Sequence, residues 1–240
     1  MKKLNIIFYV IGTVCILIAI YIVFDKYFVK DDSISINFNE DEEIVDFNNK
    51  LNETGSSLGW IVLIDALNNQ DGDGNYNVSF NSDLFDTYSY RQLFVMEYIL
   101  SNTNNYDKFK VFDTSGNVVD DFPTSDMTYA YIDYDEFNTY YKSLFGEDFD
   151  ITKAKNGNIL YDNDYVYYEN RRAGFNGVYV SMIQTDGIEY ADGEYVSNVI
   201  ITYSTRASEL VGASTDRGVI KYIKDIDGNI NFKSFVLKDR

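Results

Sequence analysis

An unbroken apolar run near the start of the chain constrains the fold more than any other feature. The 21 residues from Leu4 to Phe24 carry no charge, and 14 of them are Leu, Ile, Val or Phe. A helix of this length is about 31 Å long, which matches a bilayer hydrocarbon core of roughly 30 Å. Each of those apolar side chains contributes roughly −0.3 to −0.6 kcal/mol to insertion near the helix centre. The run therefore predicts a transmembrane helix.

Two processing routes compete with a retained anchor. A cleaved signal peptide has a shorter apolar core and small residues before the cut, whereas the nearest candidate here, Ala19-Ile20-Tyr21, ends in a bulky side chain. A lipoprotein needs a small residue before its cysteine, and Cys15 follows Gly12-Thr13-Val14, which is a poor match. The sequence favours an uncleaved anchor, with cleavage and a buried helix of a soluble domain as the open alternatives.

The basic residues beside the run do not decide its orientation. Lys2 and Lys3 precede it and Lys26 and Lys30 follow it, so the positive-inside count is a tie. The short leading tail and the long following part without cysteine favour an inside N-terminus. We therefore expect a single-pass protein of a bacterial cell membrane. In this prediction residues 1–24 form the cytoplasmic tip and the anchor, and residues 25–40 form a juxtamembrane connector. Residues 41–240 form one extracytoplasmic domain.

Composition excludes several classes of function for that domain. The chain has no histidine, and its single cysteine, Cys15, lies inside the apolar run. Ser-His-Asp and Cys-His catalysis, His-based zinc sites and disulfides within the domain are thereby ruled out. The chain has 38 acidic and 20 basic residues, so its surface repels nucleic acid and anionic lipid headgroups. Acidity also serves solubility, and hydrophobic residues at 45% indicate a folded domain rather than a disordered one.

Residue patterns predict an α+β fold, helix-rich over 41–125 and strand-rich over 126–240. In the first part we expect a helix from Asn39 or Glu40 that is broken at Gly55-Ser56-Ser57, a second over Trp60–Leu67, and a third over Asp83–Leu100 capped by Ser82. A strand over Met127–Ile132 then leads into a short helix, which begins at a capping box of Asp133 and Glu136 and stops at Gly146.

The remainder predicts a mostly antiparallel sheet of five or six strands, with the helices packed on one face. The expected strands are Tyr165–Tyr168, Val178–Ile183, Glu194–Tyr203, Val219–Ile223 and Ile230–Leu237. Hairpin turns are expected at Asp186-Gly187, Asp192-Gly193 and Asp227-Gly228.

Three groups of residues are candidates for chemistry. Asp71, Asp73 and Asn75 place oxygen ligands at alternate positions around a glycine, as in a calcium loop, but Phe80 stands where the bidentate Glu belongs. A polar connecting turn is the alternative, and no other cofactor is expected. Arg171 and Arg172 suit a carboxylate or another anionic ligand, or pair with nearby acids. The tyrosine clusters over 129–141 and 161–168 suit a stacking platform for ligands or a packed core.

Asp65 is the only acid with strongly apolar neighbours, and we interpret it as a surface residue of an amphipathic helix. Taken together, these patterns favour a domain that docks to a protein or glycan partner at the cell envelope and is not an enzyme. A carboxylate-dependent enzyme acting on envelope glycan or peptide is one alternative, and a structural subunit of a membrane complex is another.

Overall fold

The computed structural model describes residues 39–69, 76–101, 108–112, 118–119, 129–150, 152–153, 159–160, 165–169 and 177–239. All of them belong to one compact unit that spans Asn39–Arg240, and Met1–Phe38 form a separate unit. The predicted anchor, Leu4–Phe24, lies outside the described residues. Among the helices that are described, none has the length and apolar character needed to cross a bilayer.

The described unit is α+β, as the sequence predicted, but it contains two antiparallel sheets rather than one. Its helices are α2 (Glu40–Asn68), the 3-10 helix η1 (Leu84–Asp86), α3 (Tyr88–Ser101), α4 (Tyr134–Phe145) and α5 (Thr205–Val211). One sheet has the order β2-β1-β3-β5-β4, formed by β1 (Phe109–Phe112), β2 (Val118–Val119), β3 (Tyr129–Asp133), β4 (Ile159–Leu160) and β5 (Tyr165–Glu169). The other has the order β6-β7-β8-β9, formed by β6 (Val180–Ala191), β7 (Glu194–Tyr203), β8 (Thr215–Lys224) and β9 (Ile230–Leu237).

The four-stranded sheet contains four of the five expected strands, two of them with the predicted bounds, whereas the strand expected at Tyr165–Tyr168 is β5 of the other sheet. The turns at Asp192-Gly193 and Asp227-Gly228 are confirmed, and Asp192 and both glycines adopt the positive φ that tight hairpin turns require. The turn predicted at Asp186-Gly187 is wrong. Those residues lie inside β6, where the register shifts between Thr185 and Gly187, so the glycine serves a β-bulge instead. The helix α5, between β7 and β8, was not predicted.

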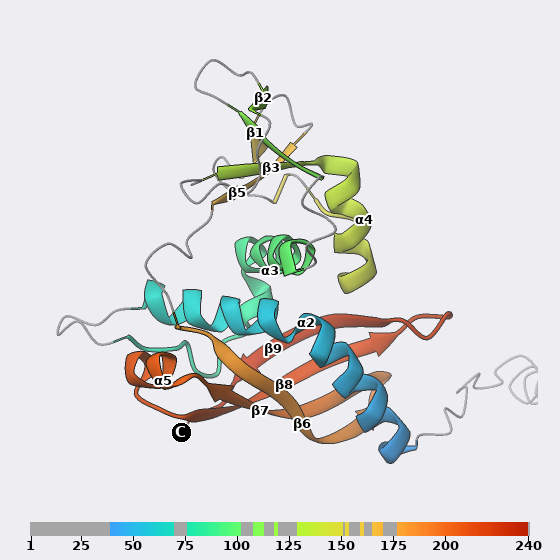
Figure 1. Cartoon of the computed structure of the whole chain (residues 1–240). Coiled ribbons are helices and arrows are strands. Elements are labelled where there is room, and N and C mark those ends of the chain that lie inside the picture. The colour runs from blue at the N-terminus through green and yellow to red at the C-terminus, as the bar shows by residue number, and fades with distance from the viewer. Residues whose placement is uncertain are drawn as a thin grey trace, which may run out of the picture. The chain divides into compact units, whose positions relative to one another are not determined.

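Helix α2 is a single helix of 29 residues that crosses one face of the four-stranded sheet (Figure 1). Its predicted start is confirmed, and the acidic first turn suits the positive end of the helix dipole. The predicted break at Gly55 is wrong, because packing on the sheet outweighs the roughly 1 kcal/mol propensity cost of a helical glycine. A second glycine, Gly59, brings the helix so close to β6 that an added Cβ would lie 2.5 Å from the Cβ of Val180.

The predicted cap of α3 is also wrong in its detail. Asp83, rather than Ser82, is the N-cap, and it caps η1, because its carboxylate accepts a hydrogen bond from the backbone N–H of Phe85. The same carboxylate oxygen accepts from the N–H of Phe235, so it also binds the edge of β9. Burial raises the pKa of Asp83, and these two backbone bonds oppose that shift.

The short helix α4 follows the sequence prediction closely. The side chain of Asp133 accepts hydrogen bonds from the N–H groups of Asp135 and Glu136. Gly146 ends the helix with φ of 72°, and its N–H donates to the carbonyl of Lys142. Phe137, Tyr141 and Leu144 are fully buried on the predicted face.

Aromatic rings fill the core between the helices and the four-stranded sheet. The ring of Phe85 packs against rings from α3, α4 and β9 at centroid distances of 5.2 to 6.1 Å. Phe47 of α2 stacks on Tyr222 at 4.4 Å, and Tyr222 stacks on Tyr195 at 5.0 Å. Within the predicted tyrosine clusters, Tyr131 and Tyr141 are buried. These two residues therefore pack in the core, which was one of the two interpretations of the tyrosine clusters.

Candidate functional site

Two of the three candidate groups that the sequence predicted lie outside the part of the chain that the structure describes. This holds for the calcium candidates Asp71, Asp73 and Asn75 and for the anion candidates Arg171 and Arg172. Over the described ranges, no group of three or more acidic side chains is arranged to hold a metal ion.

Among the described residues, a polar groove that the sequence did not reveal is a candidate site. It has a volume of about 460 Å³ and lies between α2, the ends of α3 and α4, and the turn that joins β8 to β9. We call it the α2 groove. Its lining residues are Asp46, Asn49, Lys50, Glu53, Tyr98, Ser143, Asp225, Gly228, Asn229 and Ile230. Carboxylates, amides and hydroxyls are the most frequent groups in this lining, so the groove offers many hydrogen-bonding partners.

Helical spacing places the α2 residues of the groove on one side of that helix. Asp46, Asn49, Lys50 and Glu53 follow each other at intervals of three, one and three residues, which puts them on a common stripe. No motif marks the other lining residues, because they come from three elements far apart in the sequence. Only the packing of α2 against α3, α4 and the β8–β9 turn brings them together.

Ion pairs join two of the three lining carboxylates of the α2 groove to lysines. Lys50 lies 3.4 Å from the carboxylate of Glu53, and Lys224 lies 3.0 Å from that of Asp46. The ammonium of Lys224 also contacts Glu43, which is buried in the first turns of α2. Burial lowers the pKa of Lys224, but the hydrogen bonds to Glu43 and Asp46 outweigh that effect and leave it raised. Four carboxylates, those of Glu43, Asp46, Glu53 and Asp225, therefore stand against the two ammonium groups of Lys50 and Lys224, so the groove keeps a net negative charge.

Tyr98 supplies the only aromatic ring among the residues that line the groove. The ammonium of Lys50 lies 5.8 Å from the centroid of the Tyr98 ring. The ring of Tyr140 contacts the Tyr98 ring edge-on, with 6.3 Å between the two ring centroids. Burial raises the pKa of Tyr98, and the neighbouring Glu53 adds to that shift. The phenol thus stays protonated at neutral pH and can donate a hydrogen bond.

The β8–β9 turn forms the far wall and is rigidly held. The carboxylate of Asp225 accepts hydrogen bonds from the N–H of Asp227 and from both the backbone and the side-chain amide of Asn229. The bonds from Asn229 are the main reason why the pKa of Asp225 lies below its ordinary value. A general acid needs the opposite shift, so Asp225 is poorly suited to protonate a leaving group.

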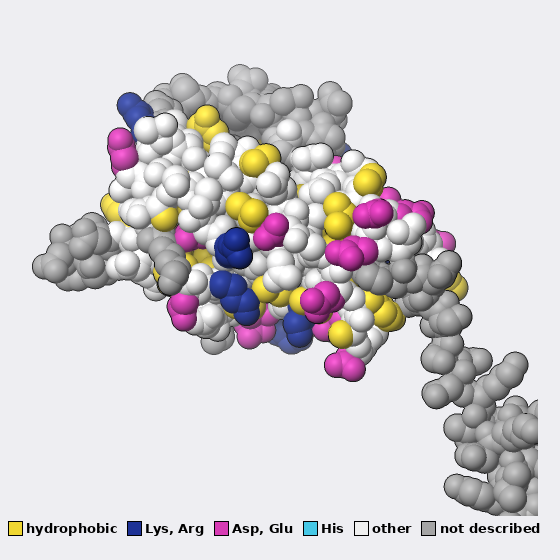
Figure 2. Space-filling model, turned by 90° about the horizontal axis from the view of Figure 1, so that it is seen from below, with side chains coloured by type: hydrophobic (Ala, Val, Ile, Leu, Met, Phe, Trp, Pro, Cys, Tyr) yellow, Lys and Arg dark blue, Asp and Glu magenta, His cyan; other side chains and the backbone are white. Residues whose placement is uncertain are grey.

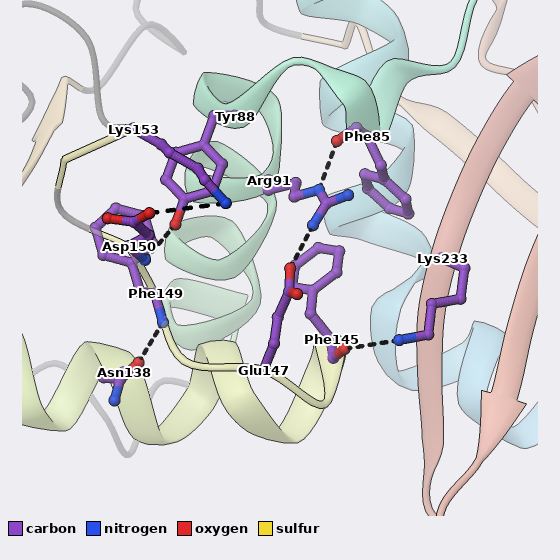
Figure 3. A network of polar contacts seen from close by, with 10 residues as sticks. All are labelled: Phe85, Tyr88, Arg91, Asn138, Phe145, Glu147, Phe149, Asp150, Lys153 and Lys233. Atoms are coloured by element: carbon purple, nitrogen blue, oxygen red, sulfur yellow. Dashed lines mark hydrogen bonds and ion pairs between the residues drawn. The ribbon is translucent and has the colours of Figure 1, made fainter.

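A network around Arg91 fixes α4, the helix that carries Ser143, against α3 (Figure 3). The guanidinium of Arg91 donates to the carbonyl of Phe85, pairs with Glu147 at 2.8 Å and lies 5.1 Å from the ring centroid of Phe145. Burial lowers the pKa of Arg91, and its neighbours Tyr141 and Glu147 more than offset this. The cation therefore stays charged while it joins the two helices.

The same network extends to the segment after α4 and to the four-stranded sheet (Figure 3). The N–H of Asp150 donates to the hydroxyl of Tyr88, and the N–H of Phe149 donates to the side chain of Asn138 at 2.7 Å. On the other side, Lys233 of β9 donates to the carbonyl of Phe145 at 3.4 Å. These contacts make the α3–α4 wall of the groove a fixed support.

Asp65 is not the surface residue that the sequence suggested. Its side chain is buried, with 3% exposed. The carboxylate accepts hydrogen bonds from the N–H and the hydroxyl of Ser79, from the amide of Asn69 at 3.1 Å and from the hydroxyl of Tyr90 at 3.3 Å. It therefore joins the end of α2 to the segment before η1 and to α3, which is a structural role.

Comparison with known proteins gives no further guide to the site: no family model, curated protein or solved structure matches this chain.

Proposed function

We propose that this chain is a membrane-anchored binding domain whose α2 groove takes a polar, uncharged stretch of cell-envelope glycan. The observation that carries the proposal is the lining of the groove, which is rich in hydrogen-bonding groups and carries a net negative charge that disfavours anions. The predicted anchor, Leu4–Phe24, supports the envelope location, since it would hold the domain at the membrane.

The chemistry of the lining selects the ligand class. Pockets for drug-like or cofactor molecules are mainly apolar, and this groove is not. An anion would meet three carboxylates against one lining ammonium, Lys50. A polyhydroxylated chain suits it better, because each sugar hydroxyl both donates to carboxylate or amide oxygens and accepts from amide and hydroxyl groups. The ring of Tyr98 offers an apolar surface for one sugar face.

Binding is better supported than hydrolysis. Two of the lining carboxylates, Asp46 and Glu53, are paired with lysine, and the third, Asp225, has a lowered pKa. Carboxylate-dependent glycoside hydrolysis needs one acid whose pKa is raised. The groove therefore supports recognition of an envelope glycan and not its cleavage.

Calorimetric titration tests the proposal. The full-length chain in detergent is titrated with soluble glycan strands released from bacterial cell wall. We expect saturable binding, and Tyr98→Ala should raise Kd about tenfold, equivalent to ~1.4 kcal/mol. Tyr98→Phe should have a smaller effect because it keeps the ring. The control is Tyr179→Ala, which removes a tyrosine that is 56% exposed and does not line the groove.

Two results would argue against the proposal. One is the absence of binding to any released glycan, and the other is a Kd that Tyr98→Ala and Tyr179→Ala change equally.

The anchor is tested separately, by fractionation and protease treatment of intact cells. We expect the chain in the membrane fraction and its domain open to protease; a protected domain would contradict the outward orientation.

A further inference from the structure

The acidic side chains of the α2 groove are more exposed than the basic side chains with which they pair. The side chains of Asp46 and Glu53 are 51% and 58% exposed. Those of their partners, Lys224 and Lys50, are only 20% and 18% exposed. The ammonium of Lys50 is also held over the ring of Tyr98. The charged atoms most open to a ligand are therefore carboxylate oxygens.

The ion pairs within the chain use these carboxylates only in part. The ammonium of Lys224 is shared between Glu43 and Asp46, so one positive charge faces two negative ones. The ammonium of Lys50 contacts a single oxygen of Glu53, at 3.4 Å. Over the described ranges, the second carboxylate oxygen of Asp46 and that of Glu53 have no hydrogen-bond or ion-pair partner. Both oxygens are thus available to a ligand.

A third carboxylate adds negative charge from the far wall. Asp225 lines the groove, and the bonds from Asn229 hold its pKa below the ordinary value, so it is ionised at neutral pH. A cation in the groove is attracted by all three lining carboxylates. Each solvent-exposed ion pair contributes only about 1.5- to 5-fold in affinity, so the charge adjusts binding that the hydrogen-bonding groups supply.

We propose that the α2 groove prefers envelope glycan in which an amino sugar has lost its N-acetyl group and carries a free ammonium. This preference rests on the proposed glycan-binding function and names the group that raises affinity above that of the uncharged stretch. An ammonium has three N–H donors and a positive charge for the free oxygens of Asp46 and Glu53, whereas an N-acetyl group has one N–H and no charge. Asn49 and Ser143 line the same groove and suit sugar hydroxyls, which a lysine side chain lacks.

Calorimetric titration with two matched ligands tests this preference. The full-length chain in detergent is titrated at about pH 6, where primary amines are protonated and carboxylates are ionised. One ligand is a short linear oligomer of N-acetylglucosamine, and the other is the same oligomer after partial removal of its acetyl groups. We expect the second to bind about fivefold more tightly, and this ratio to shrink as salt is added, because salt screens exposed charges.

Isosteric variants measure the contribution of each carboxylate. Asp46→Asn and Glu53→Gln keep the shape of the side chain and remove its charge, so the ratio of the two Kd values should fall toward one. Lys50→Gln removes the only ammonium among the described lining residues and should raise the ratio. Exposed acidic side chains also occur elsewhere, as Figure 2 shows for the face seen from below. The control for their long-range effect is Asp186→Asn, at an exposed acid outside the lining, which should leave the ratio unchanged.

The outcomes separate this preference from the proposed function. If neither oligomer binds, the glycan-binding role is contradicted, and the preference with it. Equal Kd values for the two oligomers, or a ratio that Asp46→Asn, Glu53→Gln and Asp186→Asn change alike, would overturn the preference alone. A lysine-containing peptide that binds as tightly as the deacetylated oligomer would also overturn it, because the groove would then recognise an ammonium without its sugar.

Discussion

The crossing of α2 over β6 allows a sharp test of the packing, because two glycines one helical turn apart lie in different surroundings. An added Cβ at Gly55 would meet nothing within 4 Å. At Gly59 the added Cβ would lie 2.5 Å from the Cβ of Val180 and 2.9 and 3.2 Å from its two methyl groups. Gly55→Ala and Gly59→Ala therefore make the same chemical change in one helix with opposite steric consequences.

The expected magnitudes follow from these distances. Replacing glycine by alanine inside a helix stabilises it by about 0.8–1 kcal/mol, so Gly55→Ala should raise the free energy of unfolding by roughly that amount. Gly59→Ala gains the same propensity but forces the helix away from β6. The contact is with Val180 Cβ, which cannot rotate away, so the roughly 1–3 kcal/mol cost of overpacking outweighs the gain. We expect net destabilisation of about 1–2 kcal/mol.

Urea unfolding of the domain from Asn39 to Arg240, followed by circular dichroism, measures both values. The two variants should differ by about 2–3 kcal/mol, with Gly55→Ala above the unchanged domain and Gly59→Ala below it. Equal effects would refute the close helix–strand crossing. An increase in stability for Gly59→Ala would show that α2 and β6 are farther apart than described.

Three further predictions concern buried, strained and titrating groups. Asp65→Asn should cost roughly 1–3 kcal/mol in urea unfolding, because an amide replaces one acceptor of a buried network, while the exposed control Asp186→Asn should cost little. Gly146→Ala should destabilise more than Gly193→Ala; both glycines have positive φ, but only at Gly146 does the added Cβ meet a side chain, 3.0 Å away. The lowered pKa of Asp225 stabilises the fold above pH 3.8, and this contribution is lost as the pH falls through the folded-state pKa. Unfolding measured across that acidic range should therefore depend less on pH in Asp225→Asn.

Local patterns predicted those parts of the fold that local interactions determine. The cap at Asp133 and the stop at Gly146 follow from short-range hydrogen bonds and from a backbone conformation that glycine favours. The strands from β7 to β9 follow from β-branched and aromatic composition between turn residues. These features need no knowledge of distant parts of the chain.

Tertiary contacts determine the features of the fold that local sequence patterns either missed or predicted wrongly. Gly55 was predicted to break the helix because propensity is a local property, whereas burial of α2 on the sheet keeps the helix continuous through this residue. Asp65 looked exposed because its hydrogen-bond partners at Ser79 and Tyr90 are 14 and 25 residues away. Asp186-Gly187 has the residues of a turn but serves a bulge, since the pairing of β6 with β7 continues past it.

The α2 groove was unpredictable for a similar reason. Its residues are ordinary polar side chains that carry no motif, and only the assembled fold places Asn49, Tyr98, Ser143 and Asn229 around one hollow. The residues with a recognisable pattern, Asp71, Asp73 and Asn75, lie outside the described part of the chain.

Mapping of amide chemical shifts during a glycan titration tests the central proposal most directly. Isotope-labelled protein is titrated with soluble cell-wall glycan, and shifts are followed at each assigned amide. We predict that the largest saturable changes cluster at Asn49, Tyr98, Ser143 and Asn229, with one common Kd. Changes centred on another surface, or no changes at saturating glycan, would contradict a glycan-binding role for the α2 groove.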